Sequence, residues 1–252
     1  MNPTMICSIP QPGKYVVTAM ARTPNEQIVN INSVKVNVNI KDFQGFVDHF
    51  NAPTLKTNWQ FIKGAKTQDE EAKTENEMLT LSSKSGNFNA YAHENGPFLF
   101  KQINTDFVME CRVTGMTGKQ KRSTPSYNEG GLMVLDDSDK NNQQIVQLGV
   151  FPNYNCGNML TTVSNHGRRP QYPTGNGWNY APWLQIERNG SLFHARISYN
   201  GKEWEEMAGS PVTMPQITND KILKVGLFQV TYTDNKASVS FDDFKLYIKK
   251  TK

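Results

Sequence analysis

The sequence is poor in the features that mark membrane, disulfide-rich and nucleic-acid-binding proteins. Among its 252 residues, no apolar run approaches the roughly 20 residues that a membrane-spanning helix needs. The three cysteines, Cys7, Cys111 and Cys156, have spacings that fit no zinc motif. The net charge is +4, and no basic tract is interleaved with aromatic residues. These absences exclude a membrane span and argue against a structural zinc site and a nucleic-acid partner.

Helical periodicity is almost absent after Phe43, and short strand candidates take its place. They lie at 78–83, 88–93, 107–113, 131–136, 145–151, 159–164, 183–188, 192–198, 222–231 and 237–248. Turn signals such as SKSGN, DDSDKNN and TDNK separate them, and Asn189-Gly190 and Asn200-Gly201 are strong hairpin signals. Many short strands of this kind predict an all-β, antiparallel β-sandwich of two stacked sheets.

The first forty residues form a separate segment in this interpretation. Residues 14–21 and 31–40 alternate like the two strands of a hairpin, whereas the main domain occupies residues 41–252. The string PGKYVV followed by VKVNV resembles the last strands of an immunoglobulin-like module. Residues 1–40 therefore either extend or cover the main domain, or are the remnant of such a module. No signal-peptide pattern is visible at the N-terminus.

Several strings in the main domain resemble the concanavalin A-like lectin/glucanase superfamily. They are FVDHFNAPTLKTNW, EGGLMVLDD, WLQIERNGSLFHARIS and VGLFQV with SFDDF, and they follow the family's order over residues 43–248. The nearest patterns are those of an uncharacterised bacterial and fungal branch and of the C-terminal accessory domain of β-xylosidases. The resemblance implies a jelly roll whose concave sheet binds sugars, and an extracellular or periplasmic location.

Strand alternation selects the candidate binding residues. Leu184 and Ile186 face the core, so Trp183 and its polar neighbours take the other side of the strand. Applied to five strands, this rule predicts one shared sheet face bearing Glu110, Arg112, Glu129, Gln147, Trp183, Gln185, Glu187, His194 and Arg196. The resemblance implies that this face is the concave one. The alternative is that the Glu and Arg side chains only form cross-strand pairs.

A long segment without periodicity, residues 164–183, adds Trp178 and Tyr180 at the rim of this face. Exposed aromatic rings on such a loop suit stacking against sugars. The alternative is that both rings plug the edge of the sandwich. Together these residues predict an oligosaccharide or polysaccharide ligand, and neither the sugar nor the oligomeric state follows from the sequence.

Signals for catalysis are missing. The resemblance implies that catalytic members carry E-x-D-x-x-E on one strand, and this string is absent, so no catalytic residue is assigned. We therefore expect non-catalytic carbohydrate binding, with a glycoside hydrolase or lyase using concave-face carboxylates, or a protein-interaction module, as alternatives.

No cofactor or metal is assigned. Calcium between Asp48, Asp242 and Asp243 is an alternative, because the first and last strands of a jelly roll are neighbours. The simpler interpretation is that Asp243 caps a turn or pairs with a lysine.

Overall fold

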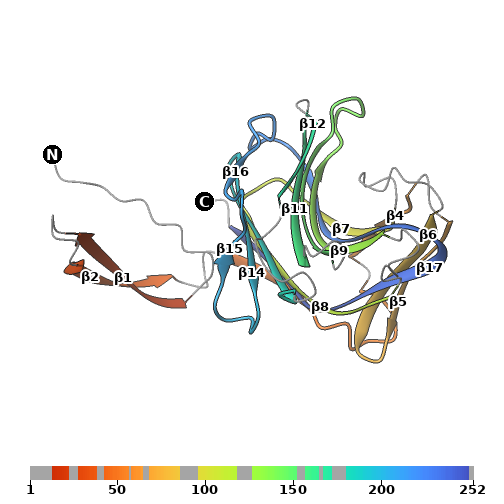
Figure 1. The fold of residues 1–252 in the computed structure, drawn as a ribbon, viewed down its shortest axis with the longest axis horizontal. Coiled ribbons are helices and arrows are strands. Elements are labelled where there is room, and N and C mark those ends of the chain that lie inside the picture. Colours follow the sequence, from red (N-terminus) through yellow and green to blue (C-terminus); the bar gives the residue numbers. More distant parts are fainter. Residues whose placement is uncertain are drawn as a thin grey trace.

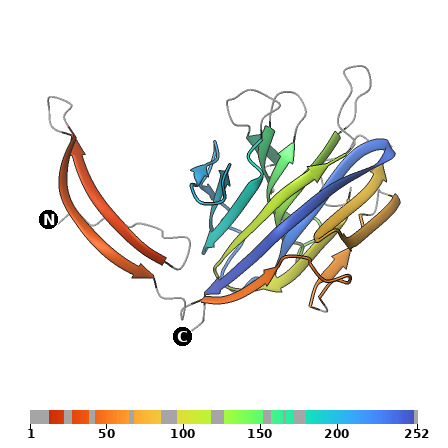
Figure 2. The same ribbon diagram turned by 90° about the horizontal axis from the view of Figure 1, so that it is seen from below.

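The computed structural model describes residues 13–22, 28–38, 43–56, 58–64, 68–85, 96–117, 127–151, 157–164, 167–171 and 180–249. The first two ranges form a two-stranded antiparallel sheet, β1 (Gly13–Arg22) and β2 (Ile28–Val38). Within the described residues, neither strand pairs with a strand of the main domain (Figure 2). The division of the chain after residue 40 stays a prediction.

The remaining strands build two stacked antiparallel sheets, which confirms the all-β sandwich (Figure 1). The front sheet has the order β4 (Gln60–Ile62), β7 (Phe98–Ile103), the first part of β17 (Leu223–Lys249), β9 (Tyr127–Asp136), β10 (Gln144–Phe151), β11 (Gly157–Ser164) and β12 (Gly167–Gln171). In Figure 1 both sheets bend in the same direction, with the front sheet on the inner side of the bend.

The back sheet is built around the second part of β17. Its strands are β3 (Phe43–Asp48), β5 (Gln68–Glu75), β6 (Met78–Ser85), β8 (Phe107–Met116), β13 (Trp183–Asn189), β14 (Leu192–Ser198), β15 (Glu205–Glu206) and β16 (Val212–Thr213). The predicted hairpin at Asn189-Gly190 joins β13 to β14, and Gly190 has the positive φ of +62° that this turn favours. No helix in the described part of the chain is long and apolar enough to span a membrane.

Strand β17 belongs to both sheets. Its residues Leu223–Tyr232 pair with β7 and β9, and from Thr233 onward it pairs with β6, β8 and β3. The sequence predicted two strands separated by a turn at TDNK, and this is wrong. The register shifts between Thr233 and Ala237, so the irregular stretch carries the strand from one sheet to the other without ending it.

The core lies between the sheets. Leu184 and Ile186 are fully buried in it, as alternation predicts, and so is Cys111, which is a free thiol. The front sheet is apolar on its other face as well, where Phe98, Met133, Ile145, Met159 and Phe228 form a second buried cluster. Burial on both faces explains why β9 and β10 read as nearly continuous apolar runs.

Candidate functional site

The predicted binding residues are divided between the two sheets. Glu129 on β9 and Gln147 on β10 belong to the front sheet, whereas the other strand residues lie on β8, β13 and β14 of the back sheet: Glu110, Arg112, Trp183, Gln185, Glu187, His194 and Arg196. The expectation of one shared face is therefore wrong, because a period of two fixes the side of a strand but not the sheet to which the strand belongs. That these residues bind a ligand stays a prediction.

The polar side chains of the back sheet bind one another. Gln185 donates from Nε2 to Glu110 Oε1 at 2.8 Å and accepts at Oε1 from Arg196 at 2.7 Å. Arg196 also pairs with Glu187 Oε2 at 2.8 Å, and Gln185 and Glu110 are only 0% and 3% exposed. Because these groups satisfy each other and face little solvent, this geometry favours the cross-strand interpretation for them.

The network continues to the sheet edge through Glu206. Its carboxylate accepts from Arg196 Nε at 2.9 Å and from the Ser210 hydroxyl, and its Oε1 lies 2.9 Å from His194 Nδ1. The Ser210 and His194 hydrogen bonds and the Arg196 charge hold the pKa of Glu206 below its ordinary value despite burial. By contrast, burial raises the pKa of Glu110, and the Gln185 hydrogen bond and the Lys245 charge only partly offset it.

Trp183 faces away from the core, as predicted. Its ring lies near two cationic groups, with the centroid 5.9 Å from Arg112 Cζ and 5.7 Å from Lys245 Nζ. The turn at Gly201, with φ +71°, packs so closely that a Cβ there would lie 2.8 Å from the ring. Trp183 is therefore held in place by the Gly201 turn, and its ring is partly exposed on the outer surface of the back sheet.

Glu129 and Gln147 on the front sheet are buried more deeply than Trp183. Gln147 donates from Nε2 to Glu129 Oε1 at 2.8 Å, and the two side chains are 3% and 0% exposed. A Cβ at Gly149 would lie 2.4 Å from Glu129 Oε1, so only glycine fits beside this carboxylate. Of the two predicted rim aromatics, Tyr180 packs against the core, which favours the edge-plug interpretation, and Trp178 lies outside the described residues.

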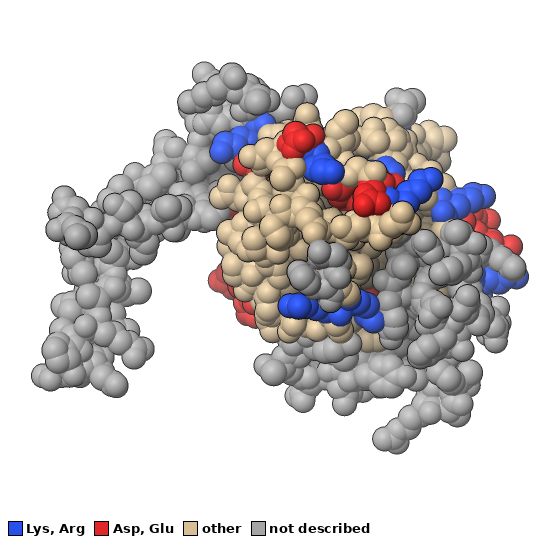
Figure 3. All heavy atoms as spheres, turned by 90° about the horizontal axis from the view of Figure 1, so that it is seen from above, with Lys and Arg blue, Asp and Glu red and all other residues tan. Residues whose placement is uncertain are grey.

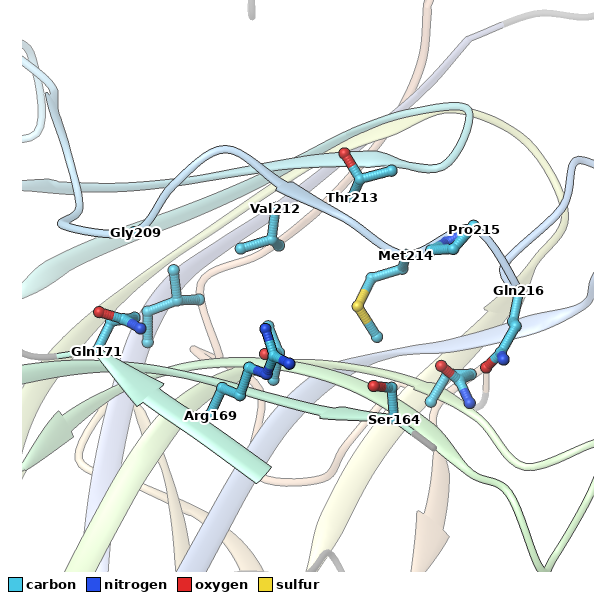
Figure 4. A pocket seen from close by; sticks show the side chains of 12 residues that line it. Ser164, Arg169, Gln171, Gly209, Val212, Thr213, Met214, Pro215 and Gln216 are labelled. Atoms are coloured by element: carbon cyan, nitrogen blue, oxygen red, sulfur yellow. The ribbon is translucent and has the colours of Figure 1, made fainter. Parts of the chain in front are cut away.

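A cavity of about 290 Å³ lies at one edge of the sandwich. Strands β11 and β12 of the front sheet form one wall, and the segment 209–216, which contains β16, forms the other (Figure 4). The lining residues are Gln144, Leu160, Thr162, Ser164, Arg169, Gln171, Gly209, Val212, Thr213, Met214, Pro215 and Gln216. The volume is close to the lower end of ordinary small-molecule sites.

The cavity combines an apolar floor with polar walls. Leu160 and Met214 belong to the core, while the hydroxyls of Thr162 and Ser164 and the amide of Gln171 supply hydrogen-bonding groups. The two walls approach closely at one end. Gly209 lies so near Gln171 that a Cβ at Gly209 would be 2.5 Å from Gln171 Cγ, and its φ of +81° also favours glycine. None of the twelve lining residues is acidic.

Sequence reasoning missed this cavity. It treated residues 164–183 as one loop, whereas the structure places the edge strand β12 at Gly167–Gln171. GRRPQ has no strand-forming pattern, and its Pro170 is tolerated because β12 is the last strand of the front sheet. No sequence signal links this segment to residues 209–216.

The predicted calcium ligands come together only in part. Asp242 and Asp243 offer ligand atoms within 4.8 Å of one another and of His49. Asp48 has other partners, since its oxygens accept from Phe50 N at 3.1 Å and Trp59 Nε1 at 2.9 Å. His49 Nδ1 itself lies 2.7 Å from Asp243 Oδ1, and a nitrogen suits calcium less well than oxygen. A calcium ion here stays an untested alternative.

Comparison with known proteins places this arrangement in a family. Residues 83–248 match the family model DUF1349, described as "Protein of unknown function". The chain belongs to the DUF1349 family. A search of curated proteins found no match to the sequence.

Solved structures share the fold of this DUF1349 protein at low identity. A functionally unknown protein from Saccharomyces cerevisiae has 18% identity and a TM-score of 0.53, with 77% of this chain and 98% of that chain covered. The laminarinase catalytic domain from Thermotoga petrophila has 12% identity and a TM-score of 0.54, with 83% and 99% covered.

The xylan β-1,4-xylosidase from Bacillus halodurans has 14% identity and a TM-score of 0.58. The match covers 92% of this chain but 46% of the xylosidase, so the chain spans about half of that enzyme's length. These likenesses show the concanavalin A-like sandwich fold.

Proposed function

We propose that this protein binds carbohydrate in the edge cavity and does not cleave it. The observation that supports the proposal is the lining: hydroxyl and amide groups lie over an apolar floor, and none of the twelve described lining residues has a carboxylate. A sugar ring offers hydroxyls on its rim and C–H groups on its faces, and it needs both kinds of surface.

The individual contacts suit a single sugar ring. Thr162 and Ser164 can each donate and accept a hydrogen bond, and Gln171 adds an amide from the neighbouring strand. Leu160 and Met214 offer an apolar surface to the C–H face of the ring. The amide nitrogen of Gln144 is already bonded to Asn142, which leaves its Oε1 as the group to receive a sugar hydroxyl.

Cleavage is disfavoured by the placement of the carboxylates. Glycoside hydrolysis ordinarily needs two carboxyl groups flanking the scissile bond. The cavity lining contains none, and on the back sheet Glu110 and Glu187 are engaged by Gln185 and Arg196. A hydrolase or lyase at the back-sheet carboxylates is the second candidate.

The fold supports carbohydrate over other small polar ligands. The solved structures that share it include a laminarinase and a xylosidase. On the same basis we propose an extracellular or periplasmic location and an oligosaccharide or polysaccharide partner. In Figure 3, acidic and basic side chains are interspersed over the described part of the visible face, with no broad basic surface of the kind that favours nucleic acid.

A glycan array followed by titration calorimetry tests the proposal. We expect binding of at least one glycan and no release of reducing sugar from it. Ser164→Trp, which fills the cavity, should reduce affinity at least about tenfold, as is typical when a buried contact surface is lost. Trp183→Ala, on the back sheet, is the matched variant and should leave affinity unchanged. Circular dichroism melting must show that both variants fold.

The outcomes separate the candidates. Loss of binding in Trp183→Ala but not in Ser164→Trp would move the site to the back-sheet surface that the sequence predicts. Release of reducing sugar would support the hydrolase. Failure to bind any glycan would refute the proposed function.

A further inference from the structure

Among the described residues that line the cavity, Arg169 is the only ionisable one, and no described carboxylate pairs with it. Within the described residues, its guanidinium makes no ion pair and no hydrogen bond, and its backbone pairs with β11. Other arginines differ: Arg188 donates to the carbonyl oxygens of Gly190, Thr105 and Thr218 at 2.8–3.2 Å, and Arg196 pairs with Glu187 and Glu206. The described lining therefore carries one positive charge, and the Arg169 guanidinium lies exposed at its rim without a described acceptor.

A guanidinium recognises anions in a specific way. Its planar array of N–H groups matches the two oxygens of a carboxylate and forms two parallel hydrogen bonds with it. Arg169 projects from β12 toward the space between the two walls (Figure 4). An anionic group bound there would meet no carboxylate among the described lining residues.

Gln216 requires a different kind of group on the ligand, a hydrogen-bond donor. Its Oε1 has no hydrogen-bond partner in the described structure and is closed off from solvent, while the side chain lines the other wall of the cavity. The amide would have to rotate about its terminal side-chain torsion, which is a soft one, to turn this oxygen toward a ligand. A buried acceptor left unpaired costs free energy, which a hydrogen-bond donor on a ligand would recover. A carboxylate cannot supply that donor, but a hydroxyl group can.

The requirements of Arg169 and Gln216 together define one class of ligand. The ligand must present a carboxylate to Arg169 and at least one hydroxyl to Gln216, across a cavity of about 290 Å³. Simple carboxylates lack the hydroxyl and neutral sugars lack the charge. Resting on the proposed carbohydrate binding, we infer that the cavity binds a hexuronic acid, held by Arg169 at its carboxylate and by Gln216 at a ring hydroxyl.

Because Arg169 belongs to the front sheet and Gln216 follows β16 of the back sheet, such a ligand would bridge the two walls. Binding should therefore also raise the melting temperature, since a ligand that binds only the folded state stabilises it. This effect gives a readout that is independent of the calorimetric signal.

Titration calorimetry with the purified full chain tests the inference. The probes are glucuronate and galacturonate, their neutral counterparts glucuronamide and galactose, and acetate. We expect a uronate to bind at least about tenfold more tightly than its neutral counterpart, which is the size of a charge-assisted hydrogen bond. Acetate should bind far more weakly, because it has no hydroxyl for Gln216.

Variants assign the preference to the two side chains. Arg169→Gln should bring uronate and neutral sugar to within about threefold of each other, whereas Gln216→Met should weaken both alike. Lys202→Gln removes one positive charge from an exposed turn outside the cavity lining, and it should change neither affinity. In each case the melting temperature without ligand reports on folding.

Each other outcome has a defined meaning. If neutral sugars bind as tightly as uronates, or if the preference survives Arg169→Gln, the inference is overturned and carbohydrate binding still stands. If acetate binds as tightly as uronate, the cavity is a simple anion site and the inference is also overturned. If no sugar binds, with or without charge, the proposed function fails and the inference fails with it.

Discussion

The carboxylate of Glu110 is buried in an environment that disfavours its charged form. It is 3% exposed, and its Oε1 accepts from Gln185 in a network that runs on to Arg196. Burial raises its pKa above the ordinary value, so the charged form of Glu110 is less favourable in the folded protein than in water. Burial of the charged form lowers the free energy of unfolding. This effect depends on pH, because the folded and unfolded states bind protons with different affinity at Glu110.

Between the ordinary pKa of a glutamate and the raised pKa of Glu110, the folded state binds more protons than the unfolded state. The free energy of unfolding therefore falls as the pH rises through this window. Glu110→Gln keeps an oxygen acceptor for Gln185 and removes the charge. We predict that the variant is at least as stable as wild type at pH 7 and loses less stability between pH 4 and pH 7, as measured by urea unfolding at several pH values.

Glu187→Gln is the matched control. Glu187 is buried as well but pairs directly with Arg196 at 2.8 Å, so removing its charge leaves the guanidinium with one of its two ion pairs, the one with Glu206. This variant should lose about 1–3 kcal/mol at pH 7. If Glu110→Gln were destabilised as much as Glu187→Gln, the burial argument for Glu110 would be wrong.

The side of the strand that each of these residues takes could be predicted from the sequence. Leu184 and Ile186 are buried between the sheets and Trp183 faces away from them, as alternation requires. Alternation could not show that Glu129 belongs to a different sheet from Glu110, because strand order depends on long-range pairing. It also could not show that Gln185 and Arg196 would use their hydrogen-bonding groups on each other.

At the scale of elements, the opening motif FVDHFNAPTLKTNW has a physical explanation. Asp48 at the end of β3 accepts from the backbone N–H of Phe50 and from Trp59 Nε1, and Lys56 lies 3.3 Å away. The Trp59 ring packs against Phe244 of β17, with centroids 4.9 Å apart. Asp48 thus ties the segment that follows β3 to the closing strand.

Asp48→Asn tests whether these hydrogen bonds stabilise the contact between the segment after β3 and β17. Both hydrogen bonds to Asp48 come from N–H donors, and an amide has one oxygen, so one donor would face an NH₂ group. We predict a loss of about 1–3 kcal/mol in the free energy of unfolding, measured with urea. Asp69→Asn is the control, because its pair with Lys84 is on the surface, where water and salt screen it, and its loss should have a much smaller effect. Equal effects of the two substitutions would contradict the assigned role of Asp48.

Prediction from sequence succeeded less well for edge elements. The Asn189-Gly190 hairpin was predicted because its turn chemistry is local, and the structure confirms it. Strand β12 could not be predicted, since an edge strand with Pro170 and two arginines lacks the apolar alternation of a half-buried strand. The candidate cavity depends on β12 lying opposite residues 209–216, and no local pattern encodes that contact.

At the scale of the whole molecule, β17 makes the two sheets dependent on each other. Its 27 residues pair with β7 and β9 in front and with β6, β8 and β3 behind. Neither sheet can lose β17 without disturbing the other, and the core between them, including Cys111, is shared. The sandwich should therefore unfold as one cooperative unit.

Cys111 provides the measurement of this cooperativity. It is fully buried on β8, and burial raises the pKa of its thiol well above the ordinary value, so a thiol reagent can react only after the core opens. In a protein carrying Cys7→Ser and Cys156→Ser, we predict that the opening free energy from Cys111 labelling equals the global free energy of unfolding from urea. Ser138→Cys, at an exposed turn, should be labelled rapidly in the native state and serves as the positive control. An opening free energy for Cys111 several kcal/mol below the global value would mean that the sheets separate while β17 stays partly paired, and a single cooperative unit would be excluded.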